Sequence, residues 1–250
     1  MPPAPKHLET EPPAAGHFLT TRWSVVLAAT GEPSPAAADA LNRLCAAYWY
    51  PLYAWMRCRG SSHHDAQDLN QAFFVHLLDQ ERLRTTGPHK GRFRSFLLAS
   101  LKNFLANEHD KAQALKRGGQ FTIISMDEEQ DESRFKFTPS HHVTPDQAFE
   151  QNWAVTLLEA VLGQLREEYT RANKAALFDA LQNYLSGDRG LTPYAELAVR
   201  MKMSEAALKM AVLRLRRRFG ERLRQEIAHT VTTEAEIDGE IRALFAAVRR

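Results

Sequence analysis

Apolar residues recur every three or four positions along most of this chain, which is the spacing that gives an α-helix one buried face. The pattern runs from Trp23 to about Arg117 and resumes at Asp146. The stretch FTII between these two parts is a brief extended run, too isolated to form a domain. The sequence therefore predicts an all-α fold.

Composition divides the chain into five segments. Residues 1–17 are rich in proline and alanine and have few large apolar groups, which predicts a disordered tail. Residues 118–145 contain paired glycines, the acidic run DEEQDE and scattered prolines, which are typical of a flexible linker. The predicted organisation is a tail at 1–17, a helical domain at 18–117, the linker at 118–145, a second helical domain at 146–230 and an amphipathic helix at 231–250.

Proline, glycine and capping signals predict where individual helices bend, begin and end. The long helix after Ser34 should be kinked or broken at Pro51 and should stop near Gly60. The final helix should begin at Thr233, because Thr233 and Glu236 have the spacing of a capping box. Its apolar stripe should cover the flank of the C-terminal domain and consists of Ile237, Ile241, Leu244, Phe245 and Val248.

The stretch LTPYAELAVRMKMSEAALKMAVLRLRRRF predicts two consecutive helices with a tight connection. Thr192 can cap the first helix, with Pro193 at the first helical position. Ser204 can cap the second helix, and Glu205 then lies beside its positive end. Apolar residues of the second helix fall within one sector, namely Leu208, Val212, Leu215 and Phe219. The pair predicts a helix-turn-helix, whose second helix enters the major groove of DNA.

Local positive charge supports this interpretation. Between Lys202 and Arg224 the chain has eight lysines and arginines but only two acids, Glu205 and Glu221. The formal charge of the whole chain is only +2, so the basicity is concentrated rather than general. The alternative is a solvated helix whose arginines confer only solubility. The preceding capped helix and the charge imbalance favour DNA binding.

Sequence signals of catalysis and metal binding are absent or weak. The chain has no Walker loop and no GxGxxG, HExxH or GxSxG motif, so we expect neither an enzyme nor a cofactor. Cys45 and Cys58 point in different directions on one predicted helix and should be free thiols. Paired histidines at 63–64 and 141–142 have no further ligand cluster, so we expect no metal. The proline-rich N-terminus and the lack of a membrane-spanning stretch predict a cytoplasmic protein without a membrane partner.

Two further segments present polar faces. In the helix containing DAQDLNQAFF, the residues Asp65, Asp68 and Gln71 lie beside the apolar face and should be exposed, either as a solvated first turn or as a docking surface. The segment KGRFRSFLLASLKNFLANEHDKAQALKRGG interleaves cations with aromatic and amide side chains, which suits single-stranded nucleic acid. Phe96 and Phe104 are better explained as core residues, whereas the sequence does not decide between a core role and a nucleic-acid contact for Phe93.

These motifs, in this order, resemble the extracytoplasmic-function (ECF) sigma factors of the sigma-70 family. The resemblance covers the chain from about Thr20 to Thr230. It implies a two-domain, non-enzymatic subunit that binds core RNA polymerase and directs it to promoters. The first domain would recognise and help melt the −10 element, and the second would read the −35 element.

The resemblance also implies roles for particular residues and partners. Asp65, Asp68 and Gln71 would dock on the clamp helices of the β′ subunit. Residues toward the −10 element would be Lys90, Arg92, Phe93, Arg94, Lys102, Asn103, Asn107, His109, Lys111, Lys116 and Arg117. Residues toward the −35 element would be Ser204, Glu205, Ala206, Lys209, Met210, Leu213, Arg214, Arg217 and Arg218. The implied partners are core RNA polymerase, through the β′ clamp helices and the β flap, promoter DNA, and an anti-sigma factor that the sequence does not identify.

Two other functions stay open at the level of sequence. A helix-turn-helix regulator that acts without polymerase would bind duplex DNA tightly as the free protein, whereas a sigma factor should bind promoters well only within holoenzyme. An RNA-binding or structural helical protein would account for the basic and aromatic segment but would leave the helix-turn-helix without a purpose.

Overall fold

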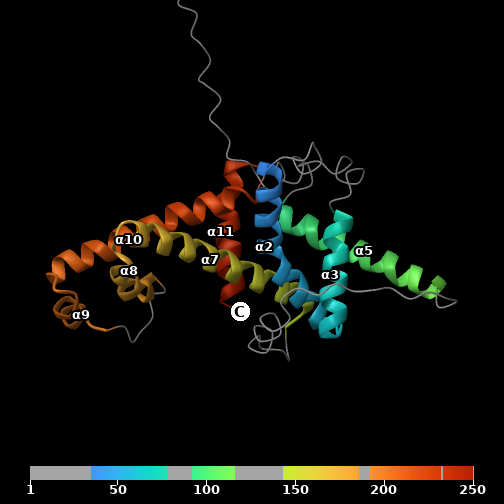
Figure 1. The fold of residues 1–250 in the computed structure, drawn as a ribbon, viewed down its shortest axis with the longest axis horizontal. Helices are drawn as coiled ribbons and strands as arrows, with labels where there is room; N and C mark the ends of the chain where they lie inside the picture. The colour runs from blue at the N-terminus through green and yellow to red at the C-terminus, as the bar shows by residue number, and fades with distance from the viewer. Residues whose placement is uncertain (1–34, 78–91, 116–142, 186–191, 232, 250) are drawn as a thin grey trace, which may run out of the picture.

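Helices make up all the regular structure in the described residues, which confirms the all-α prediction there. A computed structural model describes residues 35–77, 92–115, 143–185, 192–231 and 233–249 of the 250-residue chain. Figure 1 shows the α-helices α2 (Pro35–Cys58), α3 (His63–Leu77), α5 (Phe93–Leu115), α7 (Pro145–Arg171), α8 (Ala175–Leu181), α9 (Tyr194–Met201), α10 (Glu205–Ala228) and α11 (Ile237–Val248). Two short 3-10 helices are η2 (Gln182–Leu185) and η3 (Glu234–Glu236).

Helix α7 is the central element of the fold. It begins with a capping box: the Thr144 hydroxyl accepts from the Gln147 N–H at 3.2 Å, and the Gln147 side chain accepts from the Thr144 N–H at 2.9 Å. Pro145 at the first position has no N–H to leave unsatisfied. One end of α7 lies beside α2, and the other lies beside α8 and α10 (Figure 1). The helix therefore joins the two ends of the molecule.

One apolar core runs through all of these helices. It includes Trp55 of α2, Phe73 of α3, Trp153 of α7, Leu215 of α10 and Leu244 of α11, each at most 2% exposed. The expected division into two separate domains is not confirmed, because α7 packs against elements on both sides of that division. Residues 1–17 and most of the expected linker, 118–145, lie outside the described residues.

Helix α2 continues through Pro51, so the alternative of a broken helix does not occur. An interior proline removes a backbone hydrogen bond and costs about 3 kcal/mol or more in a helix. Here the whole stretch from Pro51 to Met56 is buried, and its packing offsets that cost. The helix ends at Cys58, and Gly60 follows with a φ of 93°, as the predicted stop requires.

The C-terminal helix α11 is more central than the sequence suggested. The predicted capping box between Thr233 and Glu236 is present, although it caps the turn η3 and α11 itself begins at Ile237. As predicted, α11 covers helices of the C-terminal part, α7 and α10; in addition, its Glu240 pairs with Arg94 of α5 and with Arg92 just before α5. Phe245 and Val248 stay exposed at 39%, so the covered stripe is narrower than predicted.

Candidate nucleic-acid interface

Helices α9 and α10 form a tightly connected pair. Lys202 ends α9 in the left-handed conformation, with a φ of 53°, which glycine adopts more readily. Ser204 caps α10, and its hydroxyl accepts from the Ala207 N–H at 3.2 Å, as predicted. The predicted start of α9 is off by one residue: Pro193 is the N-cap, with a ψ of 143°, and Thr192 instead accepts from the Tyr184 hydroxyl through its carbonyl.

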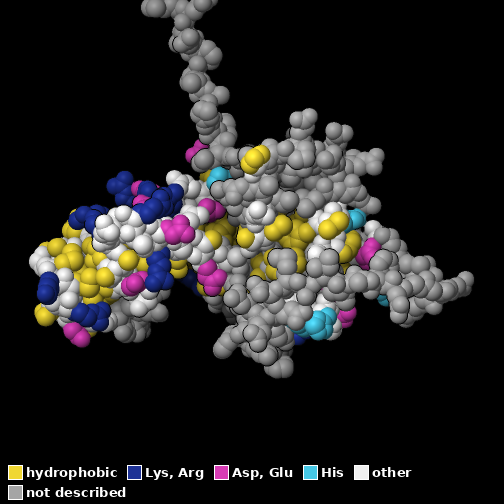
Figure 2. Space-filling model, in the orientation of Figure 1, with side chains coloured by type: hydrophobic (Ala, Val, Ile, Leu, Met, Phe, Trp, Pro, Cys, Tyr) yellow, Lys and Arg dark blue, Asp and Glu magenta, His cyan; other side chains and the backbone are white. Residues whose placement is uncertain are grey.

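The N-terminal half of α10 presents its outer face to solvent. Leu208, Val212 and Leu215 are buried and seat the helix, together with Leu197 and Ala198 of α9. The residues that the sequence placed toward the groove are all exposed, namely Ala206, Lys209, Met210 and Leu213. Figure 2 shows lysine and arginine side chains gathered over α10. The helix thus offers a mixed apolar and basic surface at the end where a recognition helix contacts base edges.

Lys209 is held over the junction of the two helices. Its Nζ lies 2.6 Å from a Glu205 carboxylate oxygen and 5.7 Å from the centre of the Tyr194 ring. The hydrogen bond to Glu205 raises the pKa of Lys209, so the side chain stays cationic at neutral pH. The Tyr194 ring in turn stacks on Tyr184, with 5.1 Å between centroids.

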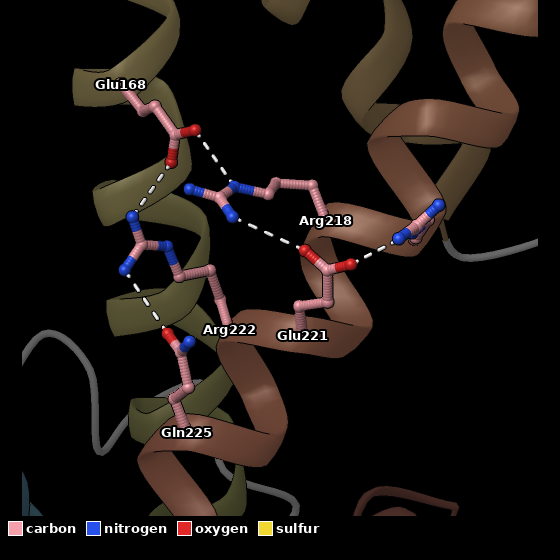
Figure 3. A network of polar contacts seen from close by, with 6 residues as sticks. Glu168, Arg218, Glu221, Arg222 and Gln225 are labelled. Carbon is pink, nitrogen blue, oxygen red and sulfur yellow. Dashed lines mark hydrogen bonds and ion pairs between the residues drawn. The ribbon is translucent and has the colours of Figure 1, made fainter. Parts of the chain in front are cut away.

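The arginines in the middle of α10 are largely engaged within the protein. Glu168 of α7 accepts from Arg218 at 2.9 Å and from Arg222 at 3.1 Å (Figure 3). Glu221 pairs with both Arg217 and Arg218. The sequence interpretation, which assigns Arg217 and Arg218 to the −35 element, counted Glu221 only as a charge and did not include Glu168, because Glu168 lies 50 residues from Arg218 in sequence. Arg214 is exposed, and its Nε donates to the Met210 carbonyl of its own helix.

Replacing Glu168 with glutamine should make stability less sensitive to acid. Hydrogen bonds from Arg218 and then Arg222 hold the pKa of Glu168 below its ordinary value. A lowered pKa stabilises the fold above the ordinary glutamate pKa, and that contribution disappears as the pH falls through the lowered pKa. Because the group is a third exposed, the effect at neutral pH should be at most about 1 kcal/mol.

The measurement is the urea midpoint of wild type and Glu168→Gln from neutral pH into the acidic range. The wild type should lose stability more steeply as the pH falls. Glu167→Gln, at an exposed neighbouring position on α7, is the control and should follow the wild type. If the urea midpoints of wild type and Glu168→Gln fall equally with pH, the ion pairs of Glu168 do not contribute to stability as proposed.

Helix α3 presents the predicted acidic face. Asp65 and Gln71 are exposed, and Asp68 is half-buried. The Asp65 carboxylate accepts from the Ser62 hydroxyl at 2.7 Å, and the Asp65 backbone N–H donates to Ser62 Oγ. Asp65 therefore also closes the first turn of α3. Asn70 is fully buried and donates to the Trp49 carbonyl at 2.9 Å, which the helical pattern did not predict.

Helix α5 keeps only part of its predicted nucleic-acid face on the surface. Lys102, Asn103, Asn107 and His109 are exposed. Lys111 lies on α5, and Lys90, Lys116 and Arg117 lie outside the described residues. Phe96 is half-buried and Phe104 is buried, as expected of core residues.

The residues at the start of α5 face inward or are paired. Phe93 is fully buried, with its ring 5.4 Å from that of Tyr48 in an edge-on arrangement. Arg94 is only 5% exposed and pairs with Glu240 and Glu150. Arg92 also pairs with Glu240. In this structure the expected contacts of Phe93 and Arg94 with DNA are therefore blocked, because Phe93 packs against α2 and acids of α11 and α7 hold Arg94.

Other candidate chemistry is limited in the part of the chain that the structure describes. Cys45 and Cys58 are free and half-buried, as predicted. Burial raises the pKa of both thiols. The described histidines, cysteines and acids form no group of three that could hold a metal ion. None of the described helices has the length and apolar character needed to cross a membrane.

Comparisons of the chain with protein-family models, with curated proteins and with solved structures found no match. The interpretation of these surfaces therefore depends on their own residues and geometry, together with the order of the sequence motifs.

Proposed function

We propose that this protein is an ECF-type sigma factor, which binds core RNA polymerase, directs it to specific promoters and helps melt the −10 region. The observation that carries the proposal is the exposed N-terminal half of α10, seated by α9 across the turn at Lys202. Such a helix can enter a major groove while its buried residues hold it in place. The proposal places the protein in the cytoplasm, where polymerase and promoters are.

The −35 contacts would come from α10. Lys209 is the cation nearest the helix start, so it is the candidate for a base edge, while Arg214 would neutralise a phosphate. Met210 and Leu213 offer apolar contact to thymine methyl groups. Arg217 and Arg218 would have to exchange Glu221 and Glu168 for phosphates.

Contacts near the −10 element would come from α5. Separating strands without ATP requires that each extruded base gain more in the protein than it loses in stacking, which is a few kcal/mol. Lys102 can follow the backbone, and the exposed amides of Asn103 and Asn107 can receive bases. The chain supplies no catalytic group in this proposal, since polymerase makes the phosphodiester bond.

The acidic face of α3 would dock on core polymerase through Asp65, Asp68 and Gln71. Such a pairing of carboxylates with cations on a partner sets orientation and speeds encounter. The aspartates therefore provide the internal test of the polymerase part of the proposal.

The testing experiment is transcription in vitro with purified core polymerase and fragmented genomic DNA of the source organism, with sequencing of the 5′ ends. We expect discrete starts that depend on this protein and share −35 and −10 elements. Asp65→Asn with Asp68→Asn should abolish these starts and weaken core binding, while asparagine still accepts from Ser62. Asp179→Asn, which neutralises an exposed acid on α8, controls for the loss of a surface acid away from α3.

Failure of this assay would be informative about the alternative. If active core gives no dependent starts but the free protein binds duplex DNA tightly, the protein is a helix-turn-helix regulator that acts without polymerase. If it binds neither core nor DNA, the proposal fails as a whole.

Arg214→Ala and Lys209→Ala should weaken promoter binding by holoenzyme in different ways. Loss of Arg214 should weaken binding for every sequence and reduce the salt slope by about 0.9, since one phosphate contact disappears. Loss of Lys209 should cost about 1–3 kcal/mol at one base position and relax the preference there.

The measurement is equilibrium binding of each holoenzyme to a promoter identified by the transcription assay and to single-base variants of that promoter, over a series of salt concentrations. Arg224→Ala is the control, because Arg224 lies in the other half of α10 and pairs with Asp238. A changed base preference with an unchanged salt slope for Arg214→Ala would contradict its phosphate role.

A further inference from the structure

The cations at the start of α5 are held by a buried acid from the far end of the chain. Glu240 of α11 is fully buried. Its two carboxylate oxygens accept from Arg94, at 2.6 Å from Nε and 3.1 Å from Nη2. Arg92 Nε lies 3.0 Å from the same carboxylate. One acid thus binds both arginines through charge-assisted contacts, and the contact with Arg94 is bidentate.

Helix α7 and the turn before α11 complete this enclosure. Arg94 also pairs with Glu150 of α7, and its guanidinium lies 4.8 Å from the centre of the Trp153 ring. The Phe93 N–H donates to the Thr230 carbonyl at 3.3 Å. The first residues of α5 are therefore covered by two elements of the C-terminal half.

A second cation of α5 is neutralised in the same way. The Asp146 carboxylate, in the first turn of α7, accepts from Lys102 at 2.7 Å and from Trp55 Nε1 at 2.8 Å. Lys102 lies eight residues beyond Arg94, which is about 12 Å along a helix. Acids of this chain therefore occupy cations at two places on α5.

We propose that α11 and the first turn of α7 occlude the nucleic-acid face of α5, and that single-stranded DNA displaces Glu240 and Asp146 from Arg92, Arg94 and Lys102. This inference rests on the proposed function, in which Lys102 follows the −10 strand, and on the family resemblance, which implies the same role for Arg92 and Arg94. Phosphates and carboxylates make the same kind of bond to guanidinium and ammonium groups, so they compete for one set of donors. The free protein is then the occluded form, and engagement of the strand opens it.

Helix α11 is suited to being displaced. Its buried residues are Ile237, Glu240, Leu244 and Ala247; the half-buried Ile241 also packs against the core, and Asp238 pairs with Arg224, so all of these contacts come from one short helix. Asp146 is exposed, and its two contacts use different oxygens, so Oδ2 can release Lys102 while Oδ1 keeps the hydrogen bond from Trp55 Nε1. The central part of α7 can stay on α2 while both acids move.

The test is the affinity of the full-length protein for a fluorescein-labelled, mixed-sequence, single-stranded DNA 20-mer over a series of salt concentrations. The variants are Glu240→Gln and Asp146→Asn, each of which removes a charge and keeps a hydrogen-bond acceptor. Asp238→Asn is the matched control, because Asp238 lies on α11 but pairs with Arg224 rather than with α5. Circular dichroism checks that each variant is folded.

We expect Glu240→Gln and Asp146→Asn to bind about tenfold more tightly than wild type at 0.1 M salt, with a salt slope steeper by about 0.7 for each phosphate gained. Asp238→Asn should behave as wild type. The change in salt slope separates competition from a purely structural role, which would alter stability alone. Asp146→Asn keeps the test decisive if Glu240→Gln does not fold, because Asp146 is at the surface.

Folded variants that bind the 20-mer with wild-type affinity and salt slope would overturn the occlusion and leave the proposed function standing, provided the transcription assay gives dependent starts. Starts that never appear, together with no binding of the 20-mer by any variant, would overturn the proposed function and this inference with it.

Discussion

Replacing Trp153 with alanine should lower the free energy of unfolding by about 3–5 kcal/mol, as expected for a large aromatic side chain removed from a core. Trp153 is 1% exposed on α7, within the core that α2 and α10 share. Its ring also faces the Arg94 guanidinium, so truncation removes a cation–π contact as well as apolar packing.

This variant also tests whether the helices unfold together. Urea unfolding followed by far-UV circular dichroism should show one transition, shifted as a whole, because α7 packs against both ends of the molecule. Val199→Ala, at a position 81% exposed, is the control and should change stability by less than about 0.5 kcal/mol. Two transitions, only one of them shifted, would contradict a common core.

Replacing Glu240 with alanine should destabilise the protein by about 3–5 kcal/mol, because it leaves Arg94 buried without its bidentate partner. The reason is the cost of a buried charge that keeps only its contact with Glu150, rather than the strength of the pair itself. The double variant Arg94→Met with Glu240→Leu should therefore recover most of the loss. Arg92 and Glu150 can turn to solvent in that variant, since they are 38% and 32% exposed.

The measurement is the urea midpoint of Glu240→Ala against wild type, followed by a double-mutant cycle over wild type, Arg94→Met, Glu240→Leu and the double variant. Asp238→Ala controls for a lost acid on α11, and it should cost no more than about 1 kcal/mol, as for other surface ion pairs. Additive losses in the cycle would show that Arg94 and Glu240 do not act as a pair.

Local signals in the sequence predicted much of the candidate interface. The cap at Ser204, the buried stripe of Leu208, Val212 and Leu215, and the exposed Lys209 all follow from short-range spacing on one helix. The capping box at Thr233 follows from the same kind of information. Such features depend on residues within one or two turns of each other, so the chain specifies them before any tertiary contact forms.

Which cations are free for a ligand was not a local property. Arg94 and Arg218 look alike in the sequence, as basic residues beside an apolar stripe, yet their partners Glu240 and Glu168 lie 146 and 50 residues away. The helical pattern gives the face on which a residue lies but not the element that covers that face. The same limit explains why the sequence does not show whether Phe93 is a core residue or a DNA contact, whereas its ring contact with Tyr48 places it in the core.

Local sequence patterns are enough to specify that the described elements are helices, that Ser204 caps α10 and that α10 carries a basic surface. The tertiary structure decided that α7 joins both groups of helices and that α11 closes over the start of α5. The physical reason is range: helical periodicity and capping act within a few residues, whereas the pairing of a buried arginine with its acid depends on how distant helices pack.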